Sequence, residues 1–180
     1  MDFEIYGDSI RAGYGLEYLV YCAEVPGFEV KNFAYNGATV FDLVEDVYTK
    51  VSRKKALALV GIGVNDLIYG RDPDRVFERL VQVVLRLQDL DRKVIVEALL
   101  PVKKKYFLSL YNFSEAEINE KIKRLNDLIE KGATSYAYYY LPYDFSKEDL
   151  STKDGLHPDE SGNDQLKIQF KNFIKDIKIS

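Results

Sequence analysis

The single histidine of the chain, His157, follows an aspartate at a spacing that suits acid–base chemistry. Both lie in the segment DGLHP at residues 154–158. The Asp154 carboxylate can accept the Nδ1 proton of the imidazole and leave Nε2 free to act as a general base. A base of this kind needs a nucleophile, and Ser9 lies near the other end of the chain, in the segment GDSI at residues 7–10. The chemistry of the protein therefore depends on whether the fold brings these two segments together.

The elements that must position these residues are expected to alternate between strand and helix. Short apolar segments alternate with segments of helical periodicity along the whole chain. The segment ALALVGI at residues 56–62 is continuously apolar, as in a strand buried on both faces. We expect strands at residues 3–6, 29–35, 56–62, 93–100 and 134–141.

Apolar residues repeat at intervals of three and four between these strands, which predicts helices. A first helix is expected to bury Cys22 as a small apolar side chain, and Pro73 opens a third helix. In the last helix, apolar residues between positions 166 and 177 form the stripe that faces the core. The stripe of the first helix is formed by Leu16, Leu19, Val20 and Ala23.

Two helix starts carry a capping box, in which a hydroxyl residue is followed three positions later by an acidic one. Thr39 and Asp42 form the first box, before a helix whose apolar stripe runs to Val51. Ser114 and Glu117 form the second box.

This order of elements predicts an α/β fold with a five-stranded parallel sheet, because parallel strands need crossover connections that place helices on both faces. The expected architecture is a three-layer αβα sandwich formed by one domain over residues 1–180. The second and fifth strands are more polar than the third and fourth, which favours sheet edges for the former. The strand order 2-1-3-4-5 follows.

Ligands of open α/β sheets bind beyond the carboxyl ends of the strands, where the strand order reverses. In the order 2-1-3-4-5 this point lies between the first and third strands. The loop after the first strand carries Ser9, the loop after the second carries NGAT at residues 36–39, and the loop after the third carries GVND at residues 63–66. The loop of His157 opens on the same rim.

Together these residues suit acyl transfer. His157 would deprotonate Ser9, and Asp154 would orient the imidazole. The backbone N–H groups of Ser9 and Gly37, with the side-chain amide of Asn65, would form an oxyanion hole. Taken singly, each segment also has a plain structural interpretation as a turn or a helix cap, so the prediction depends on the whole set.

The four segments, in this chain order, resemble the sequence blocks of the GDSL, or SGNH, hydrolase family. The resemblance implies Ser9 as the nucleophile, Gly37 and Asn65 as oxyanion residues, and Asp154 with His157 as the rest of a catalytic triad. It also implies a flavodoxin-like αβα sandwich and a serine esterase with an acyl-enzyme intermediate. A small-molecule ester would be the substrate, without a metal or an organic cofactor.

Two features depart from the family pattern. Arg11 stands where the family often has a small hydroxyl or polar residue, and we expect a surface helix arginine there rather than a contact to an acidic substrate. The second block, around Gly37, is short and poor in glycine.

Residues 101–113 are either a flap over the site or a loop with its own apolar contacts, and residues 103–105 are expected to be a solvated lysine run.

Two other functions remain open: a flavodoxin-like ligand-binding module, or a catalytically silent carbohydrate-binding relative. The sequence lacks a G-x-G-x-x-G or P-loop pattern, and a binding module would leave the pair of Asp154 and His157 without a role. The identity of the ester is also open, among lysophospholipids, acyl thioesters, aryl esters and acetylated sugars, as is the oligomeric state.

Composition excludes several other classes of function. A net charge of −4 and a pI of about 5.2 argue against a nucleic-acid partner. One histidine and one cysteine are too few for a usual zinc site, so we expect no metal. No stretch approaches the roughly 20 apolar residues of a membrane span, and strand-like sequence begins at Phe3, which together indicate a cytoplasmic protein without stable membrane insertion.

Overall fold

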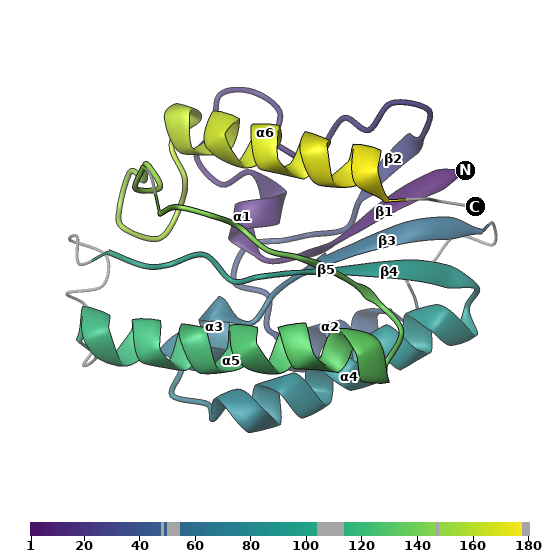
Figure 1. The fold of residues 1–180 in the computed structure, drawn as a ribbon, viewed down its shortest axis with the longest axis horizontal. Coiled ribbons are helices and arrows are strands. Elements are labelled where there is room, and N and C mark those ends of the chain that lie inside the picture. The colour runs from purple at the N-terminus through teal and green to yellow at the C-terminus, as the bar shows by residue number, and fades with distance from the viewer. Residues whose placement is uncertain (48, 50–54, 104–113, 147, 178–180) are drawn as a thin grey trace.

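A parallel sheet forms the centre of the protein in the computed structural model, which describes residues 1–47, 49, 55–103, 114–146 and 148–177. The five strands of this sheet are arranged in the order β2-β1-β3-β4-β5, as predicted (Figure 1). All pairs of neighbouring strands run parallel. The strands are β1 (Asp2–Gly7), β2 (Glu29–Asn32), β3 (Ala56–Gly61), β4 (Arg92–Glu97) and β5 (Tyr139–Leu141).

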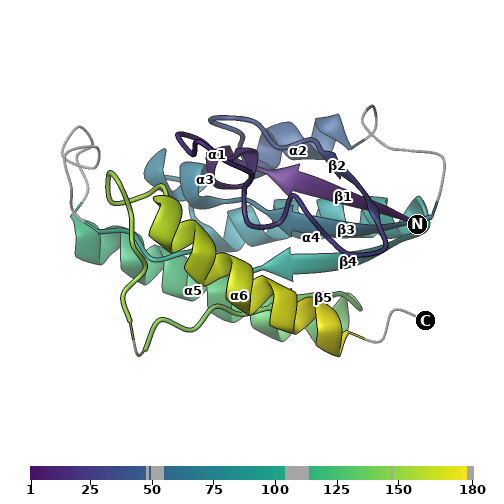
Figure 2. The same cartoon turned by 90° about the horizontal axis from the view of Figure 1, so that it is seen from above.

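Helices cover both faces of the sheet, which confirms the predicted sandwich. Helices α1 (Ser9–Ala12) and α6 (Glu160–Asp176) lie on one face (Figures 1 and 2). The opposite face carries α2 (Val40–Asp46), α3 (Val64–Ile68), α4 (Pro73–Asp89) and α5 (Glu115–Ser135). No helix in the described part of the chain is both long and apolar enough to cross a membrane.

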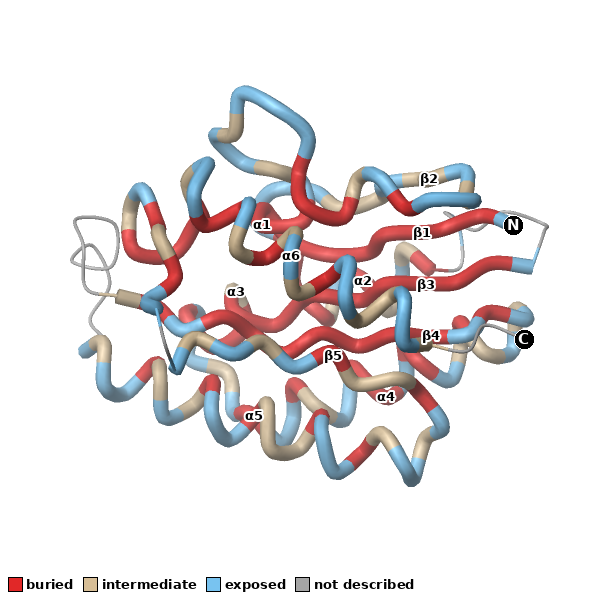
Figure 3. Tube along the Cα trace, turned by 45° about the horizontal axis from the view of Figure 1, so that its top comes forward, coloured by how far each residue is buried: buried red, intermediate tan, exposed pale blue. Residues whose placement is uncertain are grey.

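Burial follows the predicted division between central and edge strands. Every residue of β1 and β3 is buried, because helices cover both faces of these strands (Figure 3). The edge strand β2 has only exposed and half-buried residues. Cys22 is also buried, as predicted, and burial raises the pKa of its thiol.

An ion pair explains the charged residue in the middle of β1, Glu4. The Glu4 carboxylate accepts hydrogen bonds from Nε and Nη2 of Arg92, the first residue of β4, at 3.0 and 3.1 Å. The Tyr6 hydroxyl donates to the same carboxylate at 3.0 Å. Both charged side chains are buried. This pair links β1 and β4 across the intervening β3.

Both predicted capping boxes are present. The Thr39 hydroxyl accepts from the Asp42 amide, while the Asp42 carboxylate accepts from the Thr39 amide. Ser114 and Glu117 make the same reciprocal contacts at the start of α5. The later part of the stripe predicted for the first of these helices, including Val51, lies outside the described residues.

The helix predicted from the stripe of Leu16, Leu19, Val20 and Ala23 is wrong. Helix α1 ends at Ala12 because Gly13 adopts a left-handed conformation with φ of 76°, and Gly15 follows with φ of 73°. The chain then runs through turns, in which Val20 is buried while Leu19 is exposed. The apolar spacing thus reflects burial of a loop against the core.

The ends of three predicted strands also needed correction. Strand β5 begins at Tyr139 because α5 continues through Ser135, and a turn with Ala137 at φ of 53° separates the two. The ladder of β2 ends at Asn32, although the amide of Phe33 still donates to Ile5 in β1 at 2.8 Å. Strand β4 ends at residue 97 rather than 100, and the short helix α3 was not predicted.

Candidate active site

The first three strands deliver their loops to one edge of the sheet. Gly7 at the end of β1 pairs in register with Gly61 at the end of β3. On the other side of β1, the Tyr35 amide donates to the Gly7 carbonyl at 3.2 Å. The loops that follow these three residues therefore leave the sheet at adjacent points, as the topology predicted.

Ser9 is the first residue of α1, held in a tight turn at the end of β1. Asp8 is the N-cap of this helix, and its carboxylate accepts the Ile10 amide at 3.0 Å. Asp8 thus supports the turn, as predicted, and its burial raises the pKa of its carboxyl. Ser9 itself is 5% exposed. Its amide belongs to the first turn of α1, where backbone N–H groups have no acceptor within the helix.

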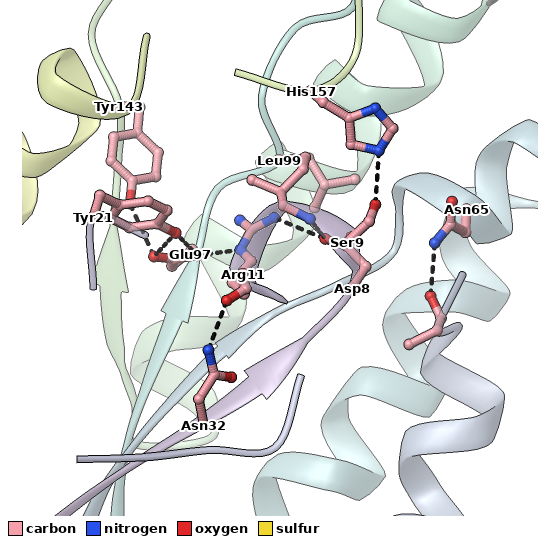
Figure 4. A network of polar contacts seen from close by, with 12 residues as sticks. Asp8, Ser9, Arg11, Tyr21, Asn32, Asn65, Glu97, Leu99, Tyr143 and His157 are labelled. Atoms are coloured by element: carbon pink, nitrogen blue, oxygen red, sulfur yellow. Dashed lines mark hydrogen bonds and ion pairs between the residues drawn. The ribbon is translucent and has the colours of Figure 1, made fainter. Parts of the chain in front are cut away.

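The structure brings Ser9 and His157 together across 148 residues of sequence. The Ser9 Oγ lies 2.9 Å from Nε2 of His157 (Figure 4). Nδ1 of the same ring lies 2.6 Å from Oδ2 of Asp154. An imidazole protonated at Nδ1 donates to Asp154 and presents Nε2 as the acceptor for the serine hydroxyl. This arrangement can remove a proton from Ser9.

Asp154 also builds the turn that carries the histidine. Its second carboxylate oxygen, Oδ1, accepts the amides of Leu156 at 3.0 Å and His157 at 2.8 Å. Partial burial alone would raise the pKa of this carboxyl, but the hydrogen bonds from His157 and Leu156 outweigh it and lower the pKa. Asp154 therefore stays ionised beside the imidazole.

An exposed tyrosine lies against the imidazole. The Tyr14 ring centroid is 4.6 Å from that of His157, with an angle of 45° between the two planes. Tyr14 is 49% exposed, so part of its ring faces solvent beside the histidine. Sequence reasoning missed this contact, because Tyr14 stands in the segment between two left-handed glycines that was expected to be helical.

Gly37, in the loop after β2, and Asn65, in the short helix α3 after β3, lie on two segments that contact each other. The Asn65 Nδ2 donates to the Ala38 carbonyl at 2.9 Å, and an amide nitrogen has a second N–H to offer (Figure 4). Gly37 adopts φ of 77°, which favours glycine, and a Cβ added there would meet nothing within 4 Å. Open space therefore adjoins the Gly37 backbone.

Asp66, the neighbour of Asn65, connects α3 to the start of α2. Its carboxylate accepts the Val40 amide at 2.9 Å and Nη1 of Arg71 at 2.6 Å. The side chain is fully buried, and this burial raises its pKa despite both contacts. Asp66 therefore fixes the start of α2 next to the loop of Gly37.

Arg11 is not the surface arginine that the sequence predicted. It is 1% exposed, and its Nε donates to Oε2 of Glu97 at 2.6 Å. The missing side chain of Gly61 leaves space for the Arg11 guanidinium over the sheet, since a Cβ there would lie 2.0 Å from Nε of Arg11. Glu97 was also missed, although it is the one acidic residue of the strand predicted at residues 93–100 and was therefore a usable signal.

The remaining site predictions fall at the edge of the described residues. The Lys103 amide donates to the Gly155 carbonyl at 2.8 Å, next to the histidine turn, and the Lys103 ammonium pairs with Asp149 at 2.7 Å. The flap proposed for residues 101–113 falls mostly on residues 104–113, outside the described ones.

Among the described residues, no group of three or more His, Cys, Asp or Glu side chains could hold a metal ion.

Comparison with known proteins identifies related sequences. Residues 5–165 match the sequence profile of the GDSL-like Lipase/Acylhydrolase family. An N-acylneuraminate cytidylyltransferase from Streptococcus agalactiae is 24% identical over 158 residues, which are 82% of this chain and 35% of that protein. The chain thus spans about a third of the length of the curated relatives that it matches.

Solved structures share the same fold. A member of the lipolytic protein G-D-S-L family from Veillonella parvula superposes with a TM-score of 0.82 at 17% identity, over 98% of this chain and 100% of that one. A carbohydrate acetylesterase from Sinorhizobium meliloti superposes with a TM-score of 0.73 at 14% identity, over 97% and 99% of the two chains.

The lowered pKa of Asp154 predicts a loss of stability in acid. A carboxyl whose pKa is lower in the folded than in the unfolded chain stabilises the fold above its unfolded pKa of about 4, and this contribution disappears as the pH falls toward the folded pKa. Asp154→Asn should flatten part of this decline in urea unfolding between about pH 3 and 6. The exposed Asp89→Asn is the control and should leave the decline intact. Identical acid profiles for the wild-type protein and Asp154→Asn would contradict the prediction.

Proposed function

Because this chain belongs to the GDSL-like lipase/acylhydrolase family, a family of carboxylic ester hydrolases, we propose that it cleaves esters of small or medium acyl groups through an acyl-enzyme. The observation that carries this proposal is the hydrogen-bonded series from Ser9 through His157 to Asp154, with contacts of 2.9 and 2.6 Å. A ligand-binding module would have no use for a serine hydroxyl held against an oriented imidazole.

The reaction begins with attack of Ser9 on the ester carbonyl. His157 removes the hydroxyl proton at Nε2 while Oγ forms a bond to the carbonyl carbon. The carbonyl oxygen becomes an oxyanion, which accepts hydrogen bonds from the amides of Ser9 and Gly37 and from the second N–H of Asn65. The Asp154 carboxylate stabilises the imidazolium that forms.

Collapse of the tetrahedral intermediate completes the first half of the reaction. The imidazolium of His157 gives its proton to the alkoxy oxygen, and the bond between this oxygen and the acyl carbon breaks. The alcohol leaves, and the acyl group stays on Ser9. Water then attacks the acyl-enzyme with His157 again as base, which releases the carboxylic acid and restores the serine.

An acetylated sugar is the ester class that we favour within this proposal. The curated relatives reported above are N-acylneuraminate cytidylyltransferases, and one structural neighbour is a carbohydrate acetylesterase. The half-exposed ring of Tyr14 beside His157 offers an aromatic surface on which the face of a sugar can pack.

This preference predicts a substrate profile. Turnover of p-nitrophenyl esters should be highest for acetate and decline with chain length to palmitate. Acetylated monosaccharides should release acetate with a KM that Tyr14→Ala raises, while p-nitrophenyl acetate is little affected. A maximum at long acyl chains, without acetate release from sugars, would refute the sugar preference but leave the esterase proposal standing.

Loss of the nucleophile should abolish turnover. Ser9→Ala is expected to reduce hydrolysis of p-nitrophenyl acetate to near background, because it removes the hydroxyl that forms the acyl-enzyme. Ser146→Ala, at an exposed serine, is the matched control and should retain wild-type activity. Full activity of Ser9→Ala would contradict the proposal.

Removal of the Asn65 amide should slow the chemical step. Asn65→Ala is expected to lower kcat by about 10²–10³, the usual effect of losing one oxyanion donor. KM should change much less, because the donor acts mainly on charge that develops in the transition state. Urea unfolding of the variant checks that the contact to Ala38 is not needed for folding. An unchanged kcat in the folded variant would exclude Asn65 from the oxyanion hole.

A further inference from the structure

A buried polar cluster lies behind the nucleophile turn. We call it the Arg11 cluster, and its centre is the Glu97 carboxylate (Figure 4). This carboxylate accepts Nε of Arg11 at 2.6 Å, the hydroxyl of Tyr21 at 2.7 and 2.8 Å, and the hydroxyl of Tyr143 at 2.9 Å. Nη1 of Arg11 also reaches Oδ1 of Asp8 at 3.5 Å. Neither the proposed triad nor the oxyanion hole uses these contacts.

The ion pair of this cluster spans three strands. Arg11 belongs to α1, which follows β1, and Glu97 is the last residue of β4, while β3 lies between them. The guanidinium crosses the end of β3 at Gly61. A Cβ added to Gly61 would lie 2.0 Å from Nε of Arg11 and 2.3 Å from Oε2 of Glu97. The crossing therefore requires glycine at this position.

Helix α1 needs such support because it has only four residues. A helix of this length forms too few internal hydrogen bonds to hold its own position. On the side of β2, Asn32 Nδ2 donates to the Arg11 carbonyl at 2.8 Å. On the side of β4, the Arg11 side chain binds Glu97. The turn that carries Ser9 is thus fixed from both sides through one residue.

The charges of the cluster fit this role. Burial disfavours the Arg11 charge, but the neighbouring groups, with the Glu97 carboxylate first among them, together outweigh burial and hold the Arg11 pKa well above its usual value. Burial, with the Glu97 charge, raises the pKa of both Tyr21 and Tyr143, so both hydroxyls stay protonated and donate. The cluster therefore holds a fixed arrangement of charge and donors.

We infer that Arg11 and Glu97 are positioning residues that set the orientation of Ser9 toward His157. The inference rests on the proposed function. Ser9 and Arg11 lie two positions apart in the same helical turn, so a shift of the guanidinium moves the serine hydroxyl relative to Nε2. A misplacement of about 1 Å in reacting groups can lower a rate by about 100-fold.

The fold supplies a matched control for this inference. Glu4 and Arg92 form a second buried pair between β1 and β4, with Tyr6 donating to the carboxylate in the same way. Its arginine is the first residue of β4, whereas Glu97 is the last, and none of the proposed site residues belongs to this pair. Both pairs contribute to the fold, but only the pair of Arg11 and Glu97 contacts the nucleophile turn.

The test compares Glu97→Gln with Glu4→Gln. In Glu97→Gln, kcat for p-nitrophenyl acetate and the rate of Ser9 labelling by a fluorophosphonate should both fall by about 10–100-fold, with KM within about threefold. In Glu4→Gln, the labelling rate should stay within about twofold of wild type, even where urea unfolding reveals an equal loss of stability. Equal labelling rates in Glu97→Gln and the wild type would overturn the inference.

A double variant tests whether the two residues act as one unit. Arg11→Met should lower the labelling rate about as much as Glu97→Gln does, and the double variant should lose little more than either single one. Fully additive losses would contradict a shared role. If the charge variants do not fold, Tyr21→Phe and Tyr6→Phe replace them, since each removes a tyrosine hydroxyl that donates to the glutamate of its own pair. Only Tyr21→Phe should slow labelling, and equal rates in both would overturn the inference.

The outcome also separates this inference from the proposed function. Absence of Ser9 labelling in the wild-type protein would refute the activated serine itself. Labelling of the wild type at a rate that Glu97→Gln does not change would refute only the positioning role.

Discussion

Two paired glycines at the ends of the central strands set the shape of the whole site. A Cβ on Gly7 would lie 2.5 Å from the Gly61 carbonyl oxygen, and a Cβ on Gly61 would overlap the guanidinium of Arg11. Close approach of backbone and buried charge is possible only because both side chains are missing. The helices α1 and α3, which follow the two glycines, carry Ser9 and Asn65, so the separation of the proposed nucleophile and oxyanion donor depends on this contact.

Two buried ion pairs connect elements of the sheet that are not neighbours and so share no backbone hydrogen bonds. The pair of Arg11 and Glu97 joins α1 to β4, and the pair of Glu4 and Arg92 joins β1 to β4. In both pairs the side chains bridge the intervening strand β3. Such pairs add little net stability over apolar side chains, because removing two charges from water offsets most of their attraction. Their value here is geometric, since each pair accepts only one relative placement of the elements that it joins.

Long-range order was predictable from the sequence, and local conformation at the site was less so. Alternating patterns with polar edge strands led to the strand order, and the order in turn predicted that Ser9 would meet His157. The conformation of residues 16–23 was mispredicted, because the left-handed Gly13 and Gly15 precede an apolar spacing that otherwise indicates a helix. The burial of Arg11 was not predictable from its own segment. It depends on Gly61 and Glu97, which are distant from Arg11 in sequence. Their contact with Arg11 can be recognised only once the pairing of the strands is known.

The central claim is that Ser9 becomes acylated with His157 as its base. Acid-quenched reactions with p-nitrophenyl acetate, analysed by intact mass and by mapping of the peptide that contains Ser9, test it most directly. We predict an acetyl group on that serine in the wild-type protein during turnover, and a greatly reduced rate of acetylation in His157→Ala. Acetylation at another residue, or equal acetylation of Ser9 in His157→Ala, would contradict the claim.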